Sequence, residues 1–261
     1  MTTIIRSPAV AGLFYPADTR QLKQEVRHLL ANAELHDLKP KALIVPHAGY
    51  VYSGAIAATA YASLGSSAAT IQRVVLLGPA HRVAVHGLAL PEADVFDTPL
   101  GSVKLDKELA QAIAHLPQVT VSREAHAMEH SLEVQLPFLQ SILGDFTLLP
   151  LAVGTTSAQD VAEVLEYLWG GAETLIVISS DLSHYLPYTT AQRVDKETVL
   201  AILRLQQPVD HEQACGSIPI GGLIIAARKH HLTPHLLDLR NSGDTAGSRD
   251  QVVGYAAIAF N

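Results

Sequence analysis

Short apolar runs recur along the chain, and each ends at a turn residue. The clearest are residues 42–45, 74–77, 148–153 and 175–178. Runs of this length without polar alternation predict strands buried on both faces, as in a parallel sheet that helices cover. We expect residues 252–260 to form a closing strand and residues 83–90 to form another, whose direction the pattern does not set.

Segments of helical composition follow most of these runs. We expect helices over residues 53–64, 158–169 and 190–205, and a core helix within the apolar stretch 218–227. This order of elements predicts an α/β fold, with a mostly parallel or mixed sheet and helices on both faces. Because no linker or repeat divides the chain, we expect residues 1–261 to form a single domain.

The composition excludes several classes of protein. Hydrophobic residues make up 48% of the chain and charged residues 16%, which argues against disorder. The net charge of −7, with no cluster of Lys or Arg, argues against nucleic-acid binding. The chain has 13 His but only 1 Cys, so a disulfide framework and a four-Cys zinc site are excluded. The many histidines still allow a His-based metal site or acid/base catalysis.

Neither the start of the chain nor its apolar runs predict a membrane protein. No basic segment leads into a signal-peptide run. The longest apolar runs are shorter than the ~18–20 residues that a membrane helix needs. We therefore expect a cytoplasmic protein without a membrane partner.

A histidine or an aspartate follows each of three predicted strands. His47 follows the first strand and His81 the second, and Asp181 and His184 follow the strand that ends at Ile178. Ligands of open α/β sheets bind outside the carboxyl ends of the strands. We therefore expect these four residues to share one site.

The single cysteine, Cys215, precedes the predicted core helix. A helix N-terminus stabilises a thiolate through its backbone dipole and N–H groups. A free cysteine is also commonly a small buried thiol. The residues alone leave both interpretations open.

A second motif competes for a metal. His126 to His130 fits the H-x-x-E-H pattern of inverted zinc peptidases, in which both histidines face the metal from one helix. Such a site needs a third ligand, for which Glu163 and Glu166 are candidates without a distinctive setting. We favour the alternative, a polar helix start, and keep His130 as a residue that lines the pocket.

Ordered motifs along almost the whole chain resemble one family. The sequence is similar to the Memo family, whose prokaryotic members are also labelled AmmeMemoRadiSam system protein B. The matching segments are Arg6–Pro16, Val45–Tyr50, Leu77–His81, Phe96–Gly101, Glu129–Pro137, Ser179–His184, Cys215-Gly216 with Pro219–Gly221, and Asn241–Asp244.

The resemblance implies a LigB-like fold, related to class III extradiol dioxygenases, which are non-haem iron enzymes. It places the metal ligands at His47, His81 and Cys215. It also places Asp181 and His184 close to that metal. As catalytic residues we expect His184 as an acid/base, Asp181 as a residue that orients a ligand histidine, and His130.

We therefore predict a Memo-like metalloprotein with a mononuclear His/His/Cys site, a dioxygenase-like oxidoreductase acting on an unidentified small molecule. Fe(II) is the expected cofactor, with copper or zinc as alternatives because a thiolate is a soft ligand. Two other functions stay open. One is a non-catalytic adaptor that binds a ligand or peptide, and the other is a zinc-dependent hydrolase at this site or at His126 and His130. The resemblance also implies an association with a radical-SAM protein and an AMMECR1-like protein.

Overall fold

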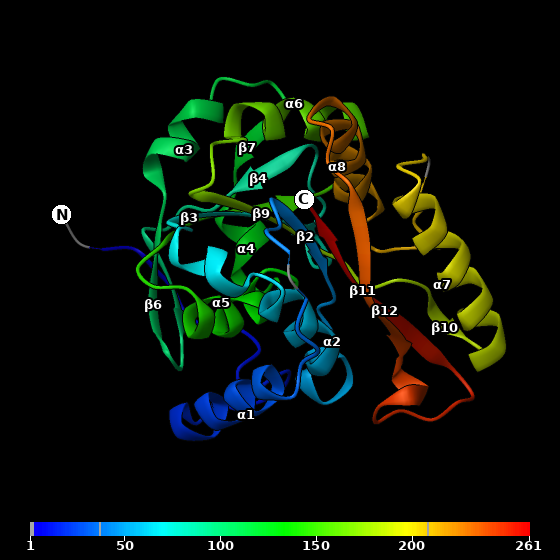
Figure 1. The fold of residues 1–261 in the computed structure, drawn as a ribbon. Coiled ribbons are helices and arrows are strands. Elements are labelled where there is room, and N and C mark those ends of the chain that lie inside the picture. Colours follow the sequence, from blue (N-terminus) through cyan, green and yellow to red (C-terminus); the bar gives the residue numbers. More distant parts are fainter. Residues whose placement is uncertain (1–2, 37, 208) are drawn as a thin grey trace.

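Five parallel strands form the centre of one mixed sheet (Figure 1). The computed structural model describes residues 3–36, 38–207 and 209–261. The central strands lie in the order β6-β8-β3-β9-β2. Their bounds are Gly101–Leu105 for β6, Thr147–Val153 for β8, Arg73–Pro79 for β3, Thr174–Ser179 for β9 and Ala42–Val45 for β2.

Further strands, most of them in antiparallel pairs, extend this centre on both sides. Next to β6 lie β5 (Val95–Thr98) and β1 (Ile5–Arg6), and next to β2 lies β12 (Val252–Phe260), which pairs with both β10 (His184–Leu186) and β11 (Pro234–Asn241). A branch of β4 (Leu88–Leu90) and β7 (Val119–Val121) leaves β8. The prediction of an α/β fold with a mixed, mostly parallel sheet is confirmed.

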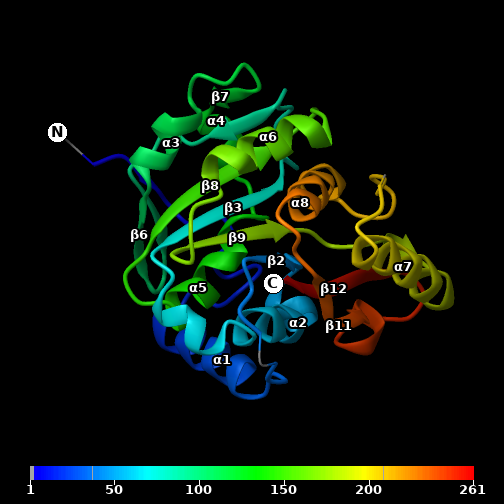
Figure 2. The same cartoon turned by 45° about the horizontal axis from the view of Figure 1, so that its top comes forward.

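Helices cover both faces of the sheet (Figures 1 and 2). On one face lie α1 (Thr19–Ala31), α2 (Tyr50–Ala62) and α5 (Leu136–Ile142), and on the other lie α3 (Lys107–Ile113), α6 (Ala158–Leu168), α7 (Tyr188–Leu203) and α8 (Ser217–Lys229). The short α4 (Arg123–Ala127) and three single-turn helices, η1 (Gly65–Ala69), η2 (Glu133–Gln135) and η3 (Ser242–Asp244), lie in connections.

Successive side chains of the central strands enter two different cores. In β2, Leu43 packs with the α1, α2 and α5 side, while Ile44 packs with the α6 and α8 side. Val177 and Ile178 of β9 divide in the same way. Each fully buried aliphatic side chain of this kind contributes about 1.5–3 kcal/mol of transfer free energy. Burial on both faces therefore explains why these strands are continuously apolar.

The expected helices form with small shifts at their ends, and one expected strand is shorter than predicted. Of residues 83–90, only Leu88–Leu90 pair as a strand, which runs antiparallel to β8. Gly87 lies just before this strand with φ of 85°, where a Cβ atom would meet the Gln118 carbonyl oxygen at 2.0 Å. Because the chain turns at Gly87, the preceding apolar residues do not extend the strand.

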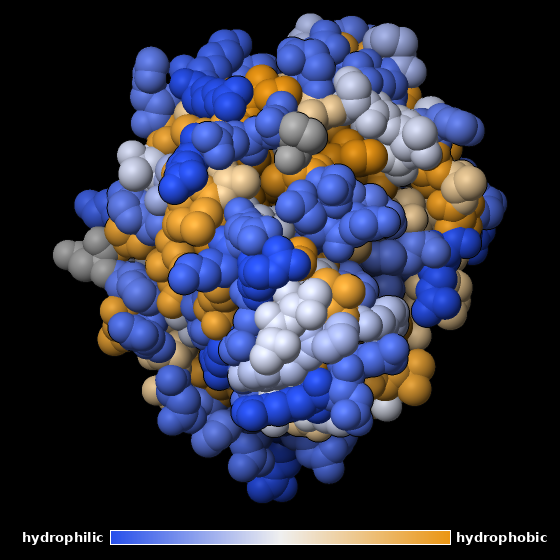
Figure 3. All heavy atoms as spheres, turned by 90° about the vertical axis from the view of Figure 1, so that its right-hand side faces the viewer, coloured by the Kyte–Doolittle hydropathy of each residue, from blue (hydrophilic) through white to orange (hydrophobic). Residues whose placement is uncertain are grey.

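The face formed by α7 and its neighbours is mostly hydrophilic, with apolar residues in separate patches (Figure 3). Among the described residues, no helix combines the length and apolar character that crossing a membrane requires.

A buried ion pair fastens the N-terminal segment to the connection that follows α4. The Glu133 carboxylate binds the Arg6 guanidinium, and it accepts hydrogen bonds from the backbone N–H groups of Ala9 and Val10 and from the Tyr15 hydroxyl. Arg6 is also bound to the carbonyl oxygen of Glu129, at 2.7 Å. This network holds the segment that carries Glu129 and His130 in a fixed place.

Candidate metal centre

The carboxyl ends of three neighbouring strands meet at one edge of the sheet. His47 lies two residues after β2, His81 two residues after β3, and Asp181 two residues after β9. The order β3-β9-β2 makes these ends adjacent. The ring centroids of His47 and His81 are 5.2 Å apart. The structure thus brings together His47 and His81, two of the four residues expected at this edge.

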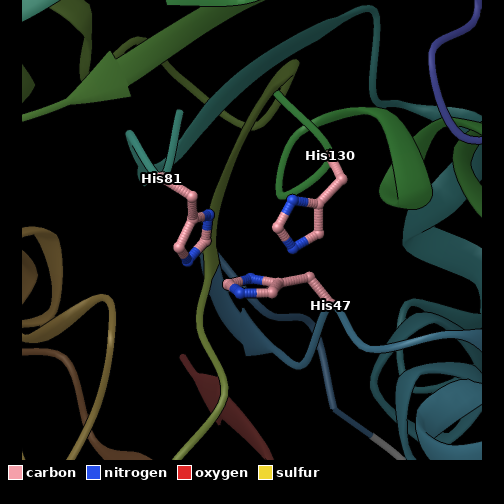
Figure 4. Close-up of side chains that lie close together, drawn as sticks. All are labelled: His47, His81 and His130. Carbon is pink, nitrogen blue, oxygen red and sulfur yellow. The ribbon is translucent and has the colours of Figure 1, made fainter. Parts of the chain in front are cut away.

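A third imidazole completes the cluster. His130 lies in the connection after α4, and its ring centroid is 5.4 Å from that of His47 and 4.6 Å from that of His81. The three rings point toward one another from three separate segments (Figure 4). One ligand nitrogen from each lies within 4.8 Å of the others, a spacing that allows all three to reach one metal ion.

A hydrogen-bond chain fixes the position of the proton on His47. The buried Ser179 hydroxyl is 2.6 Å from the Ser131 carbonyl oxygen, which can only accept, so Ser179 donates there. The Ser179 oxygen also lies 3.0 Å from His47 Nδ1, so it accepts a hydrogen bond from Nδ1–H. His47 Nε2 therefore carries the free lone pair. The backbone N–H of His47 donates to Asp181 Oδ1 at 2.7 Å.

A buried carboxylate does the same for His81. Glu129 Oε1 accepts from His81 Nδ1 at 2.9 Å, and Oε2 accepts from the backbone N–H of His81 at 2.6 Å. Burial opposes the negative charge of Glu129, but the bonds and charge of His81 and the N–H of Ser131 outweigh it and lower the pKa of Glu129 to about 2. Glu129 is thus ionised, and His81 Nε2 is left to face a metal.

His130 has an unpartnered nitrogen. Among the described residues, its buried Nδ1 forms no hydrogen bond, although Glu129 Oε1 lies 3.4 Å away. Burial lowers the pKa of His130 to about 4, and burial followed by the neighbouring His81 lowers the pKa of His47 well below its usual range. Both rings are therefore neutral near pH 7, the form that binds metals.

Cys215 lies against this cluster. Its Sγ is 3.3 Å from His47 Nε2 and 3.7 Å from the carbonyl oxygen of Asp181. Burial, followed by the charge of Asp181, raises the pKa of the Cys215 thiol to about 12. Of the two interpretations that the sequence left open, a neutral thiol agrees with this pKa, because desolvation outweighs the helix N-terminus, although Cys215 is only partly buried. A cation would favour the thiolate instead.

The other two expected site residues border the cluster. Asp181 is buried, and this burial raises its pKa to about 7. His184 is the first residue of β10 and is half-buried. This burial is the main cause that lowers the pKa of His184. The next residue, Tyr185, has φ of 57°, which is uncommon for a residue other than glycine.

The H-x-x-E-H motif is not a helical zinc site. Helix α4 ends at Ala127, so His126 and His130 do not share a helix face. The Nε2–H of His126 donates to the Ala89 carbonyl oxygen at 2.8 Å, away from the cluster. Glu163 and Glu166 are bound elsewhere, to Gln118 and to Lys229 with His230. A zinc site of this kind needs both histidines on one helix, and α4 is too short for that. The favoured alternative, a polar helix start, is wrong as well, because Glu129 lies in the connection between α4 and η2.

The donor set fits a transition metal. His47 and His81 present Nε2 lone pairs whose opposite nitrogens are held by hydrogen bonds, and His130 has an orphaned nitrogen. Imidazoles suit zinc, copper, iron and nickel, and a thiolate beside them suits copper, zinc or iron. The sequence alone signalled His130 only through its motif, and it gave no sign that Glu129 and Ser179 orient the ligands.

Comparison with known proteins identifies the family. The sequence model described as "Memo-like protein" matches residues 6–259. The chain belongs to this family. A MEMO1 family protein of Aquifex aeolicus is 37% identical, with 98% of this chain and 99% of the relative covered. A MEMO1 family protein of Methanosarcina barkeri is also 37% identical, over 97% of this chain and 99% of its own length.

The Memo fold has a counterpart among solved structures. The crystal structure of the uncharacterized protein JW3007 from Escherichia coli K12 superimposes with a TM-score of 0.53 at 19% identity. The match covers 84% of this chain and 98% of that protein. At this identity the likeness extends to the fold alone.

The Glu129 carboxylate generates a first prediction. Replacing Glu129 with Gln removes the charge that holds His81 Nδ1–H, and we expect zinc or iron affinity to fall about 10–100-fold. The measurement is competition with a chromophoric chelator. The matched control Glu124→Gln, at an exposed position on α4, should leave the affinity unchanged. Equal affinities of Glu129→Gln and the unaltered protein would contradict the assigned role.

The buried His126 generates a pH prediction. Burial lowers the pKa of His126 from 6.5 to about 4, so the unfolded chain takes up its proton first as the pH falls. His126 therefore stabilises the fold above pH 6.5, and this contribution, about 3 kcal/mol, is lost as the pH falls toward 4.

The variant His126→Gln keeps a donor for Ala89 but does not titrate. Its free energy of unfolding, measured with urea from pH 7 to pH 5, should fall less steeply than that of the unaltered protein, by about 1 kcal/mol per pH unit. His28→Gln, at an exposed histidine on α1, should reproduce the unaltered slope. A parallel pair of slopes for His126→Gln and the unaltered protein would refute the shift.

Proposed function

We propose that this chain is a metal-dependent oxidoreductase with a mononuclear site at the carboxyl edge of its sheet. The observation that carries the proposal is the convergence of three imidazoles, with nitrogens within 4.8 Å of one another, on strand ends and a fixed connection. Perturbed ionisable groups gathered in one place are typical of functional sites. The Memo family relationship supports the metal site, and the reaction is our inference.

We assign His47, His81 and Cys215 as the metal ligands. The distance of 3.3 Å from Cys215 Sγ to His47 Nε2 supports this set, since two ligands of one ion lie near that separation. The half-buried His130 then borders a position that stays open for substrate. Of the cofactors, we favour Fe(II), with copper second, because a set of two histidines and a third ligand leaves open positions for a reactant.

A bound iron or copper ion would supply the exchange of electrons with a small-molecule substrate and O₂. The chain itself supplies ligand orientation and proton handling. Glu129 and Ser179 keep the Nδ1 protons of His81 and His47 in place, so each ring presents Nε2. His130 and His184 are neutral near pH 7 and can accept a proton from a substrate hydroxyl at the open side of the site. Asp181 fixes the backbone at His47.

A zinc-dependent hydrolase is the second candidate. Three imidazoles around one ion are also a catalytic zinc arrangement, in which the fourth position holds water. The observation in its favour is the position of His130, whose ring centroid lies 5.4 Å from that of His47 and 4.6 Å from that of His81, close enough for His130 to be a third ligand. In that case Cys215 would stay a neutral thiol. The adaptor function, a cytoplasmic location and the association with radical-SAM and AMMECR1-like proteins stay predictions.

Metal analysis of variants tests the proposal. The protein is purified without oxygen, its metals are measured by mass spectrometry, and EPR spectra and O₂ uptake with catechols are recorded. We expect about one iron or copper ion per chain, and a loss of most of it in His47→Ala, His81→Ala and Cys215→Ser. The control His28→Ala should keep the full amount.

Three results would count against the proposal. Unchanged metal content in His47→Ala would remove the site. Unchanged content in Cys215→Ser together with loss in His130→Ala would replace the His/His/Cys set with three histidines. A zinc-only protein whose iron and copper forms do not react with O₂ would favour the hydrolase.

A further inference from the structure

A cavity lies at the opposite edge of the sheet from the histidine cluster. Its volume is about 570 Å³, and its walls come from three segments. These are the residues just before β2, the η1 helix with Thr70, and the turn 169–172 between α6 and β9. The strands β2 and β9 begin here and end at the metal centre, so the two sites are separate.

The charge of this cavity is opposite to that of the whole chain. Lys39 and Lys41 line it, and none of its lining residues is Asp or Glu, whereas the chain carries 25 acidic residues and a net charge of −7. The Glu173 carboxylate lies near Lys41, but it accepts from the N–H of Gly171 at 2.9 Å and from the hydroxyl of Thr174 at 2.8 Å. The lining therefore favours a negatively charged occupant.

Lys41 is held in place without an anion bound to it. Its Nζ donates to the carbonyl oxygens of Gly171 and Thr174, both at 2.8 Å, and lies 5.6 Å from the centre of the Trp169 ring. Among the described residues it forms no salt bridge. Two of its three N–H donors are thus used by the wall, and the third is left for a ligand.

Other donors around the cavity are also free. Within the described residues, the hydroxyls of Ser66 and Thr70 and the indole N–H of Trp169 form no hydrogen bond. Burial lowers the pKa of Lys41 to about 8, opposed by Glu173, and an anion would offset this cost of burying the ammonium group. The cavity therefore offers separate point donors on several walls, and the nearby Glu173 carboxylate, which does not line it, is bound to Gly171 and Thr174.

We propose that this cavity binds a phosphate monoester. Separate ammonium and hydroxyl donors suit a tetrahedral dianion, which presents oxygens in several directions. A volume of about 570 Å³ exceeds what a phosphate group fills and lies in the range of small-molecule pockets, so it accommodates the organic part of an ester. This inference is independent of the metal and of the proposed oxidoreductase.

The chain carries its own reporter for a test. Trp169 is the single tryptophan of the sequence and lines the cavity. The metal-free protein is titrated at constant ionic strength with inorganic phosphate, glycerol 3-phosphate and acetate. Tryptophan fluorescence and calorimetry are both recorded. We expect saturable binding of both phosphates, tighter for the ester, and none of acetate in the same range.

Matched variants locate the binding. Lys41→Gln should weaken binding at least about 10-fold, because a charge-assisted hydrogen bond is lost. Lys104→Gln removes the same charge from an exposed position on β6 and should have no effect. Thr70→Val is a nearly isosteric change at an exposed position and should weaken binding by a few-fold. This variant replaces Lys41→Gln as the test if Lys41→Gln does not fold.

Several outcomes would overturn the proposal. One is the absence of saturable phosphate binding by calorimetry. Another is equal weakening in Lys41→Gln and Lys104→Gln, which would indicate a general charge effect. Acetate binding as tight as phosphate would show a carboxylate site, and inorganic phosphate binding tighter than the ester would show a site for the free anion.

Discussion

The parallel pairing of β3, β9 and β2 is the constraint on which the rest of the structure depends. Each strand is buried on both faces, so the register of the pairs is fixed by two cores at once. Parallel strands bring their carboxyl ends to one edge. His47, His81 and Asp181 are delivered to that edge as a direct consequence, from segments distant in sequence.

A layer of buried polar groups turns this proximity into a metal site. Ser179 and Glu129 accept hydrogen bonds from the Nδ1–H groups of His47 and His81, and this leaves both Nε2 lone pairs for an ion. Glu129 itself is held by the connection that Glu133 and Arg6 fasten to the N-terminal segment. The arrangement of the ligands thus depends on contacts that begin at residue 6.

The sequence predicts the central strands and the edge on which His47 and His81 lie, because continuous apolar runs indicate burial on both faces and parallel strands share an edge. The sequence placed His130 at the pocket, and it lies in the histidine cluster, but the helical geometry of the H-x-x-E-H spacing is absent because α4 ends at Ala127. The pKa of Cys215 could not be predicted either, because it depends on burial that outweighs the neighbouring helix. The roles of Glu129, Ser179 and Lys41 depend on contacts across 48 to 133 residues of chain, which a local pattern does not contain.

The most direct test of the account is a crystal structure of the metal-loaded protein, with the ion located by anomalous scattering at its absorption edge. The account predicts one ion about 2.0–2.3 Å from Nε2 of His47, Nε2 of His81 and Sγ of Cys215. The Nδ1 atoms should stay bonded to Ser179 and Glu129. An ion held through either Nδ1 atom, or one placed away from these strand ends, would contradict it.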